Sequence, residues 1–169
     1  PFGSGMVAGD TGIVLNNHMD DFSIGIGQGN SYQLVGNRAN GIEAYKRPLS
    51  SMSPTFVESE KGLLAIGTPG GSRIISMVVL SVLEYIGSNA LVTDAVVSLP
   101  RYHHQYLPDR VQIEPESFDK DWLDELKRRG HNVEVYRRKW GNMQAVHCPN
   151  LQKNCVVLND PRGRQGVVF

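Results

Sequence analysis

Short hydrophobic runs, separated by glycine-rich or polar turns, predict a chain built largely from short strands. The best-defined pair is residues 55–57 and 63–66, because the polar turn Ser59-Glu60-Lys61-Gly62 joins them directly. Further strands are predicted at residues 6–8, 12–15, 110–114, 132–136, 143–147 and 155–158.

Three segments have helical character. The strongest, residues 72–87, carries hydrophobic side chains on nearly every face, so we expect a helix that is buried all round. A second helix is predicted around residues 91–98. The third, residues 118–129, is a surface helix that Ser117 or Asp119 can cap and that Gly130 ends. Strands, two buried helices and further strands predict mixed α and β layers rather than a regular βαβ alternation.

Composition narrows the class of protein. The 169 residues include 17 Lys+Arg and 17 Asp+Glu, and 40% are hydrophobic, which is an ordinary globular balance. This excludes a disordered tail, a coiled coil and a collagen-like chain, and it argues against nucleic-acid binding by bulk charge. No apolar run reaches the roughly 18 residues that a membrane helix needs. We expect residues 1–169 to form one domain, or part of one, since the chain starts at Pro1 without a methionine.

Polar side chains crowd directly after the strand at 12–15, at the start of a loop that extends to Pro48. A loop of this length in a compact domain is usually functional or disordered. Within it, Asp20 and Asp21 can pair with an ammonium group. The alternative is a turn in which Asn and Asp side chains bond their own backbone, and composition alone favours that alternative.

A second polar cluster lies at residues 46–54, where Lys46 and Arg47 precede the hydroxyls of Ser50 and Ser51. Hydroxyls and backbone N–H groups beside basic residues can hold a carboxylate. The alternative is a plain loop that leads into the next strand, and the residues alone favour it.

The third cluster is the segment Gly67-Thr68-Pro69-Gly70-Gly71-Ser72-Arg73, between a strand and the strongest helix. A Gly70-Gly71 pair lets two amide N–H groups face one point, and the helix start adds partial positive charge. This arrangement suits an oxyanion, as in acyl transfer. It is not a phosphate-binding P-loop, because the lysine of that motif is missing. The string Gly25, Gly27, Gly29 lacks the strand–helix context of a dinucleotide site.

The cysteines and histidines give weaker signals. Cys148 and Cys155 flank a turn-like Pro149-Asn150, so they can pair across a hairpin in an oxidising compartment or remain two thiols. The histidines match no zinc spacing and are interpreted as structural. No nucleophile elbow of the form G-x-S-x-G is present.

Five segments together resemble the small, C-terminal subunit of the gamma-glutamyltranspeptidase family, in the order that the family has them. They are GSGMVAGDTGIVLNNHMDDFS (3–23), KRPLSSMSPT (46–55), GTPGGSRI (67–74), PRYHHQYLPDRV (100–111) and NDPRGRQG (159–166). The resemblance implies an α+β fold of the N-terminal nucleophile hydrolase type, an αββα sandwich of which residues 1–169 are an incomplete part. It also implies a precursor that cuts itself to free a threonine, which then attacks the substrate amide.

The resemblance assigns roles to individual residues. Asp21 corresponds to the residue that binds the alpha-ammonium of the gamma-glutamyl donor. Ser50 and Ser51 correspond to the pair that holds its alpha-carboxylate. Gly70 and Gly71 correspond to the oxyanion hole, in agreement with the interpretation of that turn from its own residues.

Tyr32 falls where some family members place an aromatic residue on a lid over the pocket. His18 departs from the family, whose members commonly have Gln or Glu there, accepting a hydrogen bond from the donor ammonium. The catalytic threonine of the family precedes the segment that matches Pro1. Thr11 cannot replace it, because an internal residue lacks the free alpha-amine.

The leading hypothesis is therefore part of a gamma-glutamyltransferase or hydrolase that acts on glutathione-like donors. The first alternative is a related acylase with another substrate, a beta-lactam side chain or poly-gamma-glutamate; the second is a non-catalytic relative. The expected partners are the large subunit of the same precursor, the small-molecule donor, and an amine, peptide or water acceptor.

No cofactor, metal, nucleic acid or membrane partner is expected. We expect the chain alone to be inactive and to self-associate. The residues alone do not determine the cellular location of the protein. The resemblance favours the periplasm or secretion, and the cytoplasm is the alternative.

Overall fold

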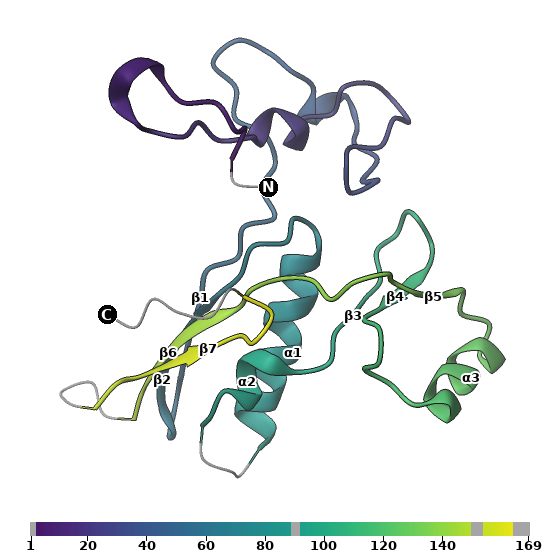
Figure 1. Ribbon diagram of the computed structural model, residues 1–169. Helices are drawn as coiled ribbons and strands as arrows, with labels where there is room; N and C mark the ends of the chain where they lie inside the picture. Colours follow the sequence, from purple (N-terminus) through teal and green to yellow (C-terminus); the bar gives the residue numbers. More distant parts are fainter. Residues whose placement is uncertain (1–2, 89–91, 150–153, 164–169) are drawn as a thin grey trace. The chain divides into compact units, whose positions relative to one another are not determined.

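The computed structural model describes residues 3–88, 92–149 and 154–163 of the chain (Figure 1). The chain divides into two compact units, Pro1–Ser50 and Ser51–Phe169. Helices and sheets occur together without regular alternation, which confirms the α+β class. A single incomplete domain stays a prediction. Among the described residues, no helix combines the length and the apolar character that crossing a membrane requires.

A four-stranded antiparallel sheet forms the centre of the second unit, with the strand order β1-β2-β6-β7. Its strands are β1 (Thr55–Ser59), β2 (Gly62–Gly67), β6 (Gln144–Cys148) and β7 (Val156–Asn159). All four were predicted to within two residues at each end. The register places Leu64 opposite Val57 and His147, so these three side chains share one face of the sheet.

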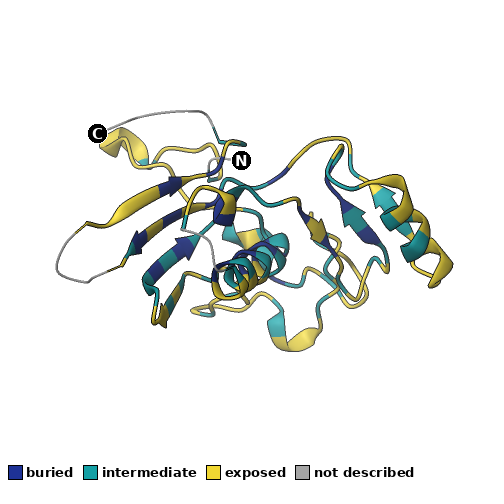
Figure 2. Ribbon diagram, turned by 90° about the horizontal axis from the view of Figure 1, so that it is seen from below, coloured by how far each residue is buried: buried dark blue, intermediate teal, exposed yellow. Residues whose placement is uncertain are grey.

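The main core lies between that face and helix α1 (Arg73–Gly87), as Figures 1 and 2 show. Leu64 and Ile66 of β2 are buried there against Met77 and Tyr85 of α1. The short helix α2 (Ala95–Ser98) adds two buried valines, Val96 and Val97. The second predicted helix is thus present in its described part, while residues 89–91 lie outside the described residues.

The expectation that α1 is buried on all sides is wrong for this structure. Its buried residues face the sheet, but a stripe of apolar side chains on another face is exposed. The stripe comprises Ile75, Val79, Leu83 and Ile86, each at least half exposed. Hydrophobic periodicity identifies apolar positions, but whether each is buried depends on what packs against it.

A smaller sheet of three strands has the order β3-β4-β5. These strands are β3 (Tyr102–His103), β4 (Val111–Ile113) and β5 (Val133–Val135). Helix α3 (Lys120–Arg128) connects the parallel pair β4 and β5. The Asp119 side chain accepts a hydrogen bond from the Trp122 amide at 2.8 Å, which confirms the predicted cap. The two-residue strand β3 was not predicted.

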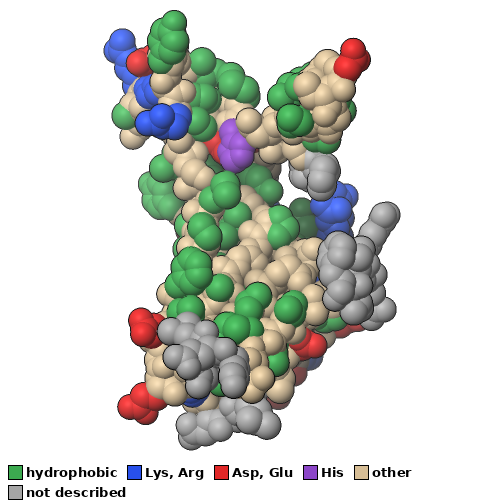
Figure 3. All heavy atoms as spheres, turned by 90° about the vertical axis from the view of Figure 1, so that its left-hand side faces the viewer, with side chains coloured by type: hydrophobic (Ala, Val, Ile, Leu, Met, Phe, Trp, Pro, Cys, Tyr) green, Lys and Arg blue, Asp and Glu red, His purple; other side chains and the backbone are tan. Residues whose placement is uncertain are grey.

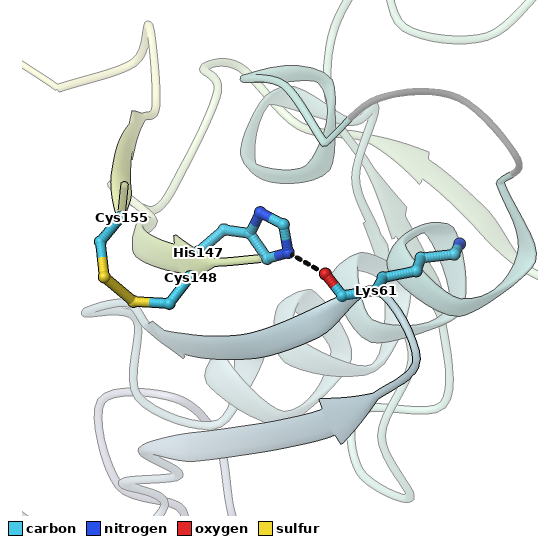
Figure 4. Close-up of a disulfide and its surroundings, with 4 residues drawn as sticks. All are labelled: Lys61, His147, Cys148 and Cys155. Carbon is cyan, nitrogen blue, oxygen red and sulfur yellow. Dashed lines mark hydrogen bonds between the residues drawn. A yellow bond between two sulfur atoms is a disulfide. The ribbon is translucent and has the colours of Figure 1, made fainter. Parts of the chain in front are cut away.

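A disulfide joins Cys148, at the end of β6, to Cys155, just before β7 (Figure 4). The pairing alternative for the two cysteines is therefore the one that the structure contains. Beside it, the His147 ring forms a 2.8 Å hydrogen bond to the backbone oxygen of Lys61, in the β1–β2 turn. This contact and the disulfide hold one end of the sheet together.

Four charged residues connect distant parts of the second unit; Arg101, Glu114 and Asp160 are buried and Arg162 is half-buried. Arg162 pairs with Glu114 at 2.6 Å, and Arg101 pairs with Asp160. Asp160 also accepts hydrogen bonds from the Met143 amide and from Arg162. Two positive and two negative side chains therefore compensate one another away from water.

The first unit contains 3-10 turns and isolated bridges rather than long elements. Its described turns are η1 (Gly9–Thr11), η2 (His18–Asp21) and η3 (Arg38–Asn40). The two predicted strands at 6–8 and 12–15 do pair, through bonds such as Ala8 N–H to Ile13 O at 2.9 Å. Between these two segments the structure has a single isolated bridge, Val7–Val14, rather than extended strands.

Candidate functional site

The turn η2 brings His18 and Asp21 into direct contact. Side chains three residues apart eclipse one another in a 3-10 helix, so these two lie on the same side of the turn. The Nδ1 atom of His18 lies 2.8 Å from Oδ2 of Asp21. Asn16 starts the turn by accepting a hydrogen bond from the His18 amide at 3.0 Å. The first polar cluster is therefore a built turn that presents an imidazole–carboxylate pair.

Asp20 and Asp21 have different partners. Oδ2 of Asp20 accepts hydrogen bonds from the amide of Ser31, at 3.0 Å, and from its hydroxyl. Within the described part of the chain, the Asp21 side chain is bonded only to His18. Both His18 and Asp21 remain more than one-third exposed. Asp21 is therefore the carboxylate that can still meet a cation from solution.

Tyr32 lies in a tight turn that is attached to η2. The Asn30 side chain accepts hydrogen bonds from the amides of Tyr32, at 3.0 Å, and Leu34, at 3.1 Å. The amide of the same side chain donates to the backbone oxygen of Asp20 at 3.3 Å. The turn thus holds Tyr32 close to the residue that precedes Asp21.

Asn40 is a positioning residue that the sequence interpretation missed. Its Nδ2 donates to the backbone oxygen of Asp21 at 2.8 Å and to Oγ of Ser23 at 3.3 Å. Its Oδ1 accepts from the amide of Leu49 at 2.9 Å. Asn40 therefore connects η2 to the segment that leads to Ser50. An isolated Asn in a long loop carries no signal that would have identified it.

Ser50 and Ser51 lie where the two units meet in the sequence, Ser50 in the first and Ser51 in the second. Ser50 is exposed and Ser51 is half-buried. The backbone oxygen of Ser51 accepts a hydrogen bond from Oγ of Ser53 at 3.0 Å. Their predicted role in holding a carboxylate stays a prediction.

Gly70 and Gly71 form the turn between β2 and α1. Both have positive φ, +154° and +57°, which favours glycine at these positions. The turn closes through the Arg73 amide to Gly70 O, at 3.2 Å, and the Ile74 amide to Gly71 O, at 3.0 Å. A Cβ atom on Gly70 would lie 2.6 Å from Cε of Met77, so the flexible end of the Met77 side chain would have to move to make room for it.

The amides of the same two glycines are available to a ligand. In the described residues, neither Gly70 N–H nor Gly71 N–H donates a hydrogen bond to the protein. Arg73, the first residue of α1, is held elsewhere, because its guanidinium donates to Gln112 and lies 4.5 Å from the Tyr136 ring. The turn therefore offers two N–H groups at the start of a 15-residue helix, which suits an oxyanion.

The histidines of the second unit have structural partners. His103 contacts Oγ of Ser76 at 2.7 Å and Oε1 of Gln105 at 2.8 Å. Burial lowers the pKa of His103 below its usual value of 6.5, against the opposing effect of the Gln105 hydrogen bond. His104 forms an exposed pair with Asp109 at 2.8 Å. Across the described ranges, no group of three or more His, Cys, Asp or Glu side chains could hold a metal ion.

The structure thus brings together His18, Asp21 and the turn of Tyr32 in the first unit, and Gly70 with Gly71 in the second. Each group is consistent with the chemistry predicted for it: cation recognition by a carboxylate, and anion recognition by backbone amides. The Gly25-Gly27-Gly29 string lies between turns and bridges, without the strand–helix context of a dinucleotide site.

Comparison with known proteins places these groups in context. The family model for gamma-glutamyltranspeptidase matches residues 1–169. The glutathione hydrolase proenzyme of Escherichia coli K12 is 46% identical over 146 residues, covering 86% of this chain and 25% of that protein. The Pseudomonas aeruginosa proenzyme of the same name is 40% identical over 166 residues, covering 96% of this chain and 29% of that protein. The chain therefore spans between a quarter and three-tenths of these relatives.

Among solved structures, a mutant gamma-glutamyltranspeptidase of Helicobacter pylori is similar with a TM-score of 0.85 and 40% identity. The match covers 96% of this chain and 88% of that one. This similarity confirms the predicted fold of the N-terminal nucleophile hydrolase type.

Proposed function

Because the chain belongs to the gamma-glutamyltranspeptidase family, we propose that the protein of which it forms part cleaves gamma-glutamyl amides such as glutathione. The observation that carries the proposal is that the two acidic residues of η2 have different bonding partners. Asp20 is bonded to Ser31, whereas Asp21 is exposed and bonded only to His18 among the described residues. An exposed, positioned carboxylate suits the alpha-ammonium group that every gamma-glutamyl donor carries.

The proposed reaction is an acyl transfer through an N-terminal threonine that residues 1–169 do not supply. The threonine hydroxyl attacks the gamma-carbonyl carbon and its proton passes to the alpha-amine of the same residue. The C–N bond then breaks, the leaving amine takes the proton, and a glutamyl ester remains on the threonine. Water or an acceptor amine releases glutamate or a new gamma-glutamyl amide from this ester.

Gly70 and Gly71 act at the step in which charge develops. As the carbonyl carbon becomes tetrahedral, its oxygen acquires negative charge, and the two amide N–H groups at the start of α1 donate to it. Donors of this kind lower the barrier because they are already oriented before the reaction begins. The support is the turn geometry and the absence of competing acceptors for these amides in the described residues.

The other site residues orient the donor. In this proposal Asp21 binds its ammonium, the hydroxyls of Ser50 and Ser51 bind its carboxylate, and Tyr32 covers it. Thr11 is unsuited to the nucleophile role, because its Oγ1 donates to the backbone oxygen of Ala8 at 2.6 Å and its own amide is part of the chain. The large subunit of the same precursor completes the enzyme, in keeping with the name proenzyme that the curated relatives carry.

One observation favours a second candidate, an acylase with an altered acyl group. The carboxylate that would bind the ammonium already has a partner in His18, at 2.8 Å. A site in which that charge is partly compensated can accept an acyl group without an ammonium, such as the side chain of a beta-lactam. The two candidates differ in one measurable property, the preference for a donor that carries the ammonium.

The test uses the complete precursor. We expect it to cleave itself, to leave a new N-terminal threonine, and to release p-nitroaniline from gamma-glutamyl-p-nitroanilide. The uncleaved precursor serves as the control and should be inactive. Complete self-cleavage without turnover of any gamma-glutamyl compound would contradict the proposal, and turnover of glutaryl-p-nitroanilide alone would favour the second candidate.

A further inference from the structure

The contact between His18 and Asp21 has a consequence for substrate choice. The imidazole occupies Oδ2 of the carboxylate at 2.8 Å, and the two side chains remain 41% and 36% exposed. Because both reach solvent, the contact can be broken or made without unfolding η2. The backbone of η2 is fixed independently, by Asn16 at its start and Asn40 at its end.

We propose that His18 is a specificity-determining residue that competes with the ammonium group of the donor for the Asp21 carboxylate, so that donor recognition weakens as the imidazole becomes protonated. This inference rests on the proposed function. It differs from that function in assigning a pH response to one side chain of the binding site.

The chemistry of the two protonation states supports the competition. A neutral His18 with its proton on Nδ1 donates one hydrogen bond to Oδ2, and Asp21 keeps its negative charge and its second oxygen for the ammonium. A protonated His18 forms a full ion pair with Asp21, which cancels that charge, and it also repels the incoming cation. The charge of the imidazole therefore decides how much of the Asp21 charge is left for the donor.

The side chains around the His18–Asp21 pair are mostly uncharged, so we assign the pH response of donor recognition to His18. On η2 itself the other charged group is Asp20, whose Oδ2 is bonded to Ser31. The segments bonded to η2 contribute the side-chain amides of Asn30 and Asn40, which do not titrate. Among the described residues, no lysine or arginine forms an ion pair or a hydrogen bond with His18 or Asp21.

The experiment measures KM between pH 5.5 and pH 8.5 for the mature enzyme made from the complete precursor. It compares gamma-glutamyl-p-nitroanilide with glutaryl-p-nitroanilide, which has the same acyl chain without the ammonium. The second donor reports pH effects on the nucleophile and on the oxyanion turn, because it uses both. The ratio of the two KM values cancels these shared effects. The donor ammonium begins to lose its own proton near the top of this pH range, but it does so equally for every variant, so comparing the ratio between variants isolates the contribution of His18.

Two variants complete the design. His18→Gln retains a side chain that can donate to Asp21 but does not titrate. His104→Gln is the matched control, since His104 forms the same kind of exposed His–Asp pair, at 2.8 Å from Asp109, away from the proposed site residues in sequence.

We expect the KM ratio of gamma-glutamyl to glutaryl donor to rise about tenfold from pH 8.5 to pH 5.5 in the wild type and in His104→Gln. In His18→Gln the ratio should stay constant to within about twofold. An equal pH dependence in His18→Gln and the wild type would overturn the inference and leave the proposed function intact. A lack of turnover of both donors by every self-cleaved form would overturn the proposed function, and the inference with it.

Discussion

Asp20 and Asp21 are consecutive in the sequence, yet the carboxylate of Asp20 is bonded to a later residue and that of Asp21 to an earlier one. Asp20 bonds forward to Ser31, eleven residues later, whereas Asp21 bonds back to His18, three residues earlier. The first contact fixes the turn that carries Tyr32. The second leaves a partly exposed carboxylate with a replaceable partner, which is the basis of the different roles proposed for these two identical side chains.

This separation predicts different effects of the same substitution at the two positions. Asp21→Asn should raise the KM of the mature enzyme for gamma-glutamyl-p-nitroanilide by about 10- to 100-fold, since one hydrogen bond to a charged group is worth about 1.5–3 kcal/mol. Asp20→Asn retains an acceptor for Ser31 and should raise KM by less than about fivefold. Initial-rate measurements test both, and equal losses at the two positions would contradict the assignment.

Gly70 is predicted to be irreplaceable, for reasons of both space and catalysis. Gly70→Ala places a Cβ 2.6 Å from Cε of Met77, at a φ of +154° that side chains disfavour. Alanine retains its amide N–H, so kcat falls only as far as the altered backbone turns that donor away from the oxyanion. We expect a fall of at least about tenfold, with the roughly 10²- to 10³-fold cost of a lost oxyanion donor as the upper limit. Gly67→Ala is the control, because a Cβ there meets no atom within 4 Å. A Gly70→Ala enzyme with the kcat of Gly67→Ala would show that the reaction does not depend on the glycine conformation of this turn.

The buried charges predict how the protein responds to acid. Burial alone would raise the pKa of Asp160, but hydrogen bonds from the Met143 and Arg162 amides and from the Arg101 side chain outweigh it and hold the pKa below its usual 3.8. The folded state therefore binds this proton less readily than the unfolded chain. The stabilisation from Asp160 is complete above about pH 4 and is lost as the pH falls through the lower folded-state value.

Thermal melting of the mature protein between pH 2 and pH 6 tests this dependence. Tm should fall below pH 4 in the wild type. Asp160→Asn should melt lower at pH 6 and show a shallower fall, because its amide does not titrate. The same slope in both proteins would show that other carboxylates determine the acid sensitivity.

Exposed apolar side chains predict self-association of the isolated chain. On the outer face of the main sheet, Phe56, Val146 and Val157 share one row and are between 39% and 73% exposed. Hydrophobic side chains appear on the sheet side of the second unit in Figure 3. Surfaces of this kind promote association of a chain without its natural partner. We expect sedimentation velocity to detect oligomers.

A matched pair of substitutions tests the role of this face. Phe56→Lys removes apolar area and should increase the monomer fraction. Gln144→Lys adds the same charge to an exposed polar position on the same face, and should have a smaller effect. A sharp monomer peak for the unmodified chain would refute the prediction.

The disulfide should contribute measurably to stability. It closes a loop with a sequence separation of 7 residues, for which the loop-entropy model gives about 2–3 kcal/mol. A Cys148→Ser, Cys155→Ser double variant should have a free energy of unfolding lower by this amount, and therefore a lower denaturant midpoint. Reductant should lower the wild-type midpoint toward that of the variant and leave the variant unchanged. An unchanged wild-type midpoint with confirmed reduction would show that the sheet does not depend on the crosslink.

Local signals were sufficient to predict much of the fold. The polar turn after Ser59 determines the β1–β2 hairpin, and Asp119 caps α3 as expected. The burial of α1 was misjudged at residues such as Leu83, which is 62% exposed, because an apolar pattern does not say what covers it. The pairing of Arg101 with Asp160 was missed because the partners lie 59 residues apart and charged residues are usually expected at the surface.

In the candidate site, residues with a local sequence signal could be predicted, and residues positioned by the path of a loop could not. Gly70 and Gly71 lie between a strand end and a helix start, and both signals are visible in the sequence, whereas their positive φ angles are evident only in the structure. Asp20 and Asp21 were indistinguishable there, because their partners are set by the path of an irregular loop. Asn40 was missed for the same reason, since its bond to Asp21 spans 19 residues.

The buried charge cluster also constrains the order in which the chain can mature during synthesis. Arg101 and Glu114 leave the ribosome well before Asp160 and Arg162, their partners 59 and 48 residues later. Until those residues emerge, closing the second unit would bury two uncompensated charges. We therefore expect the second unit to close only after Asp160 and Arg162 have been synthesised, so that a nascent chain ending before Asp160 would remain open.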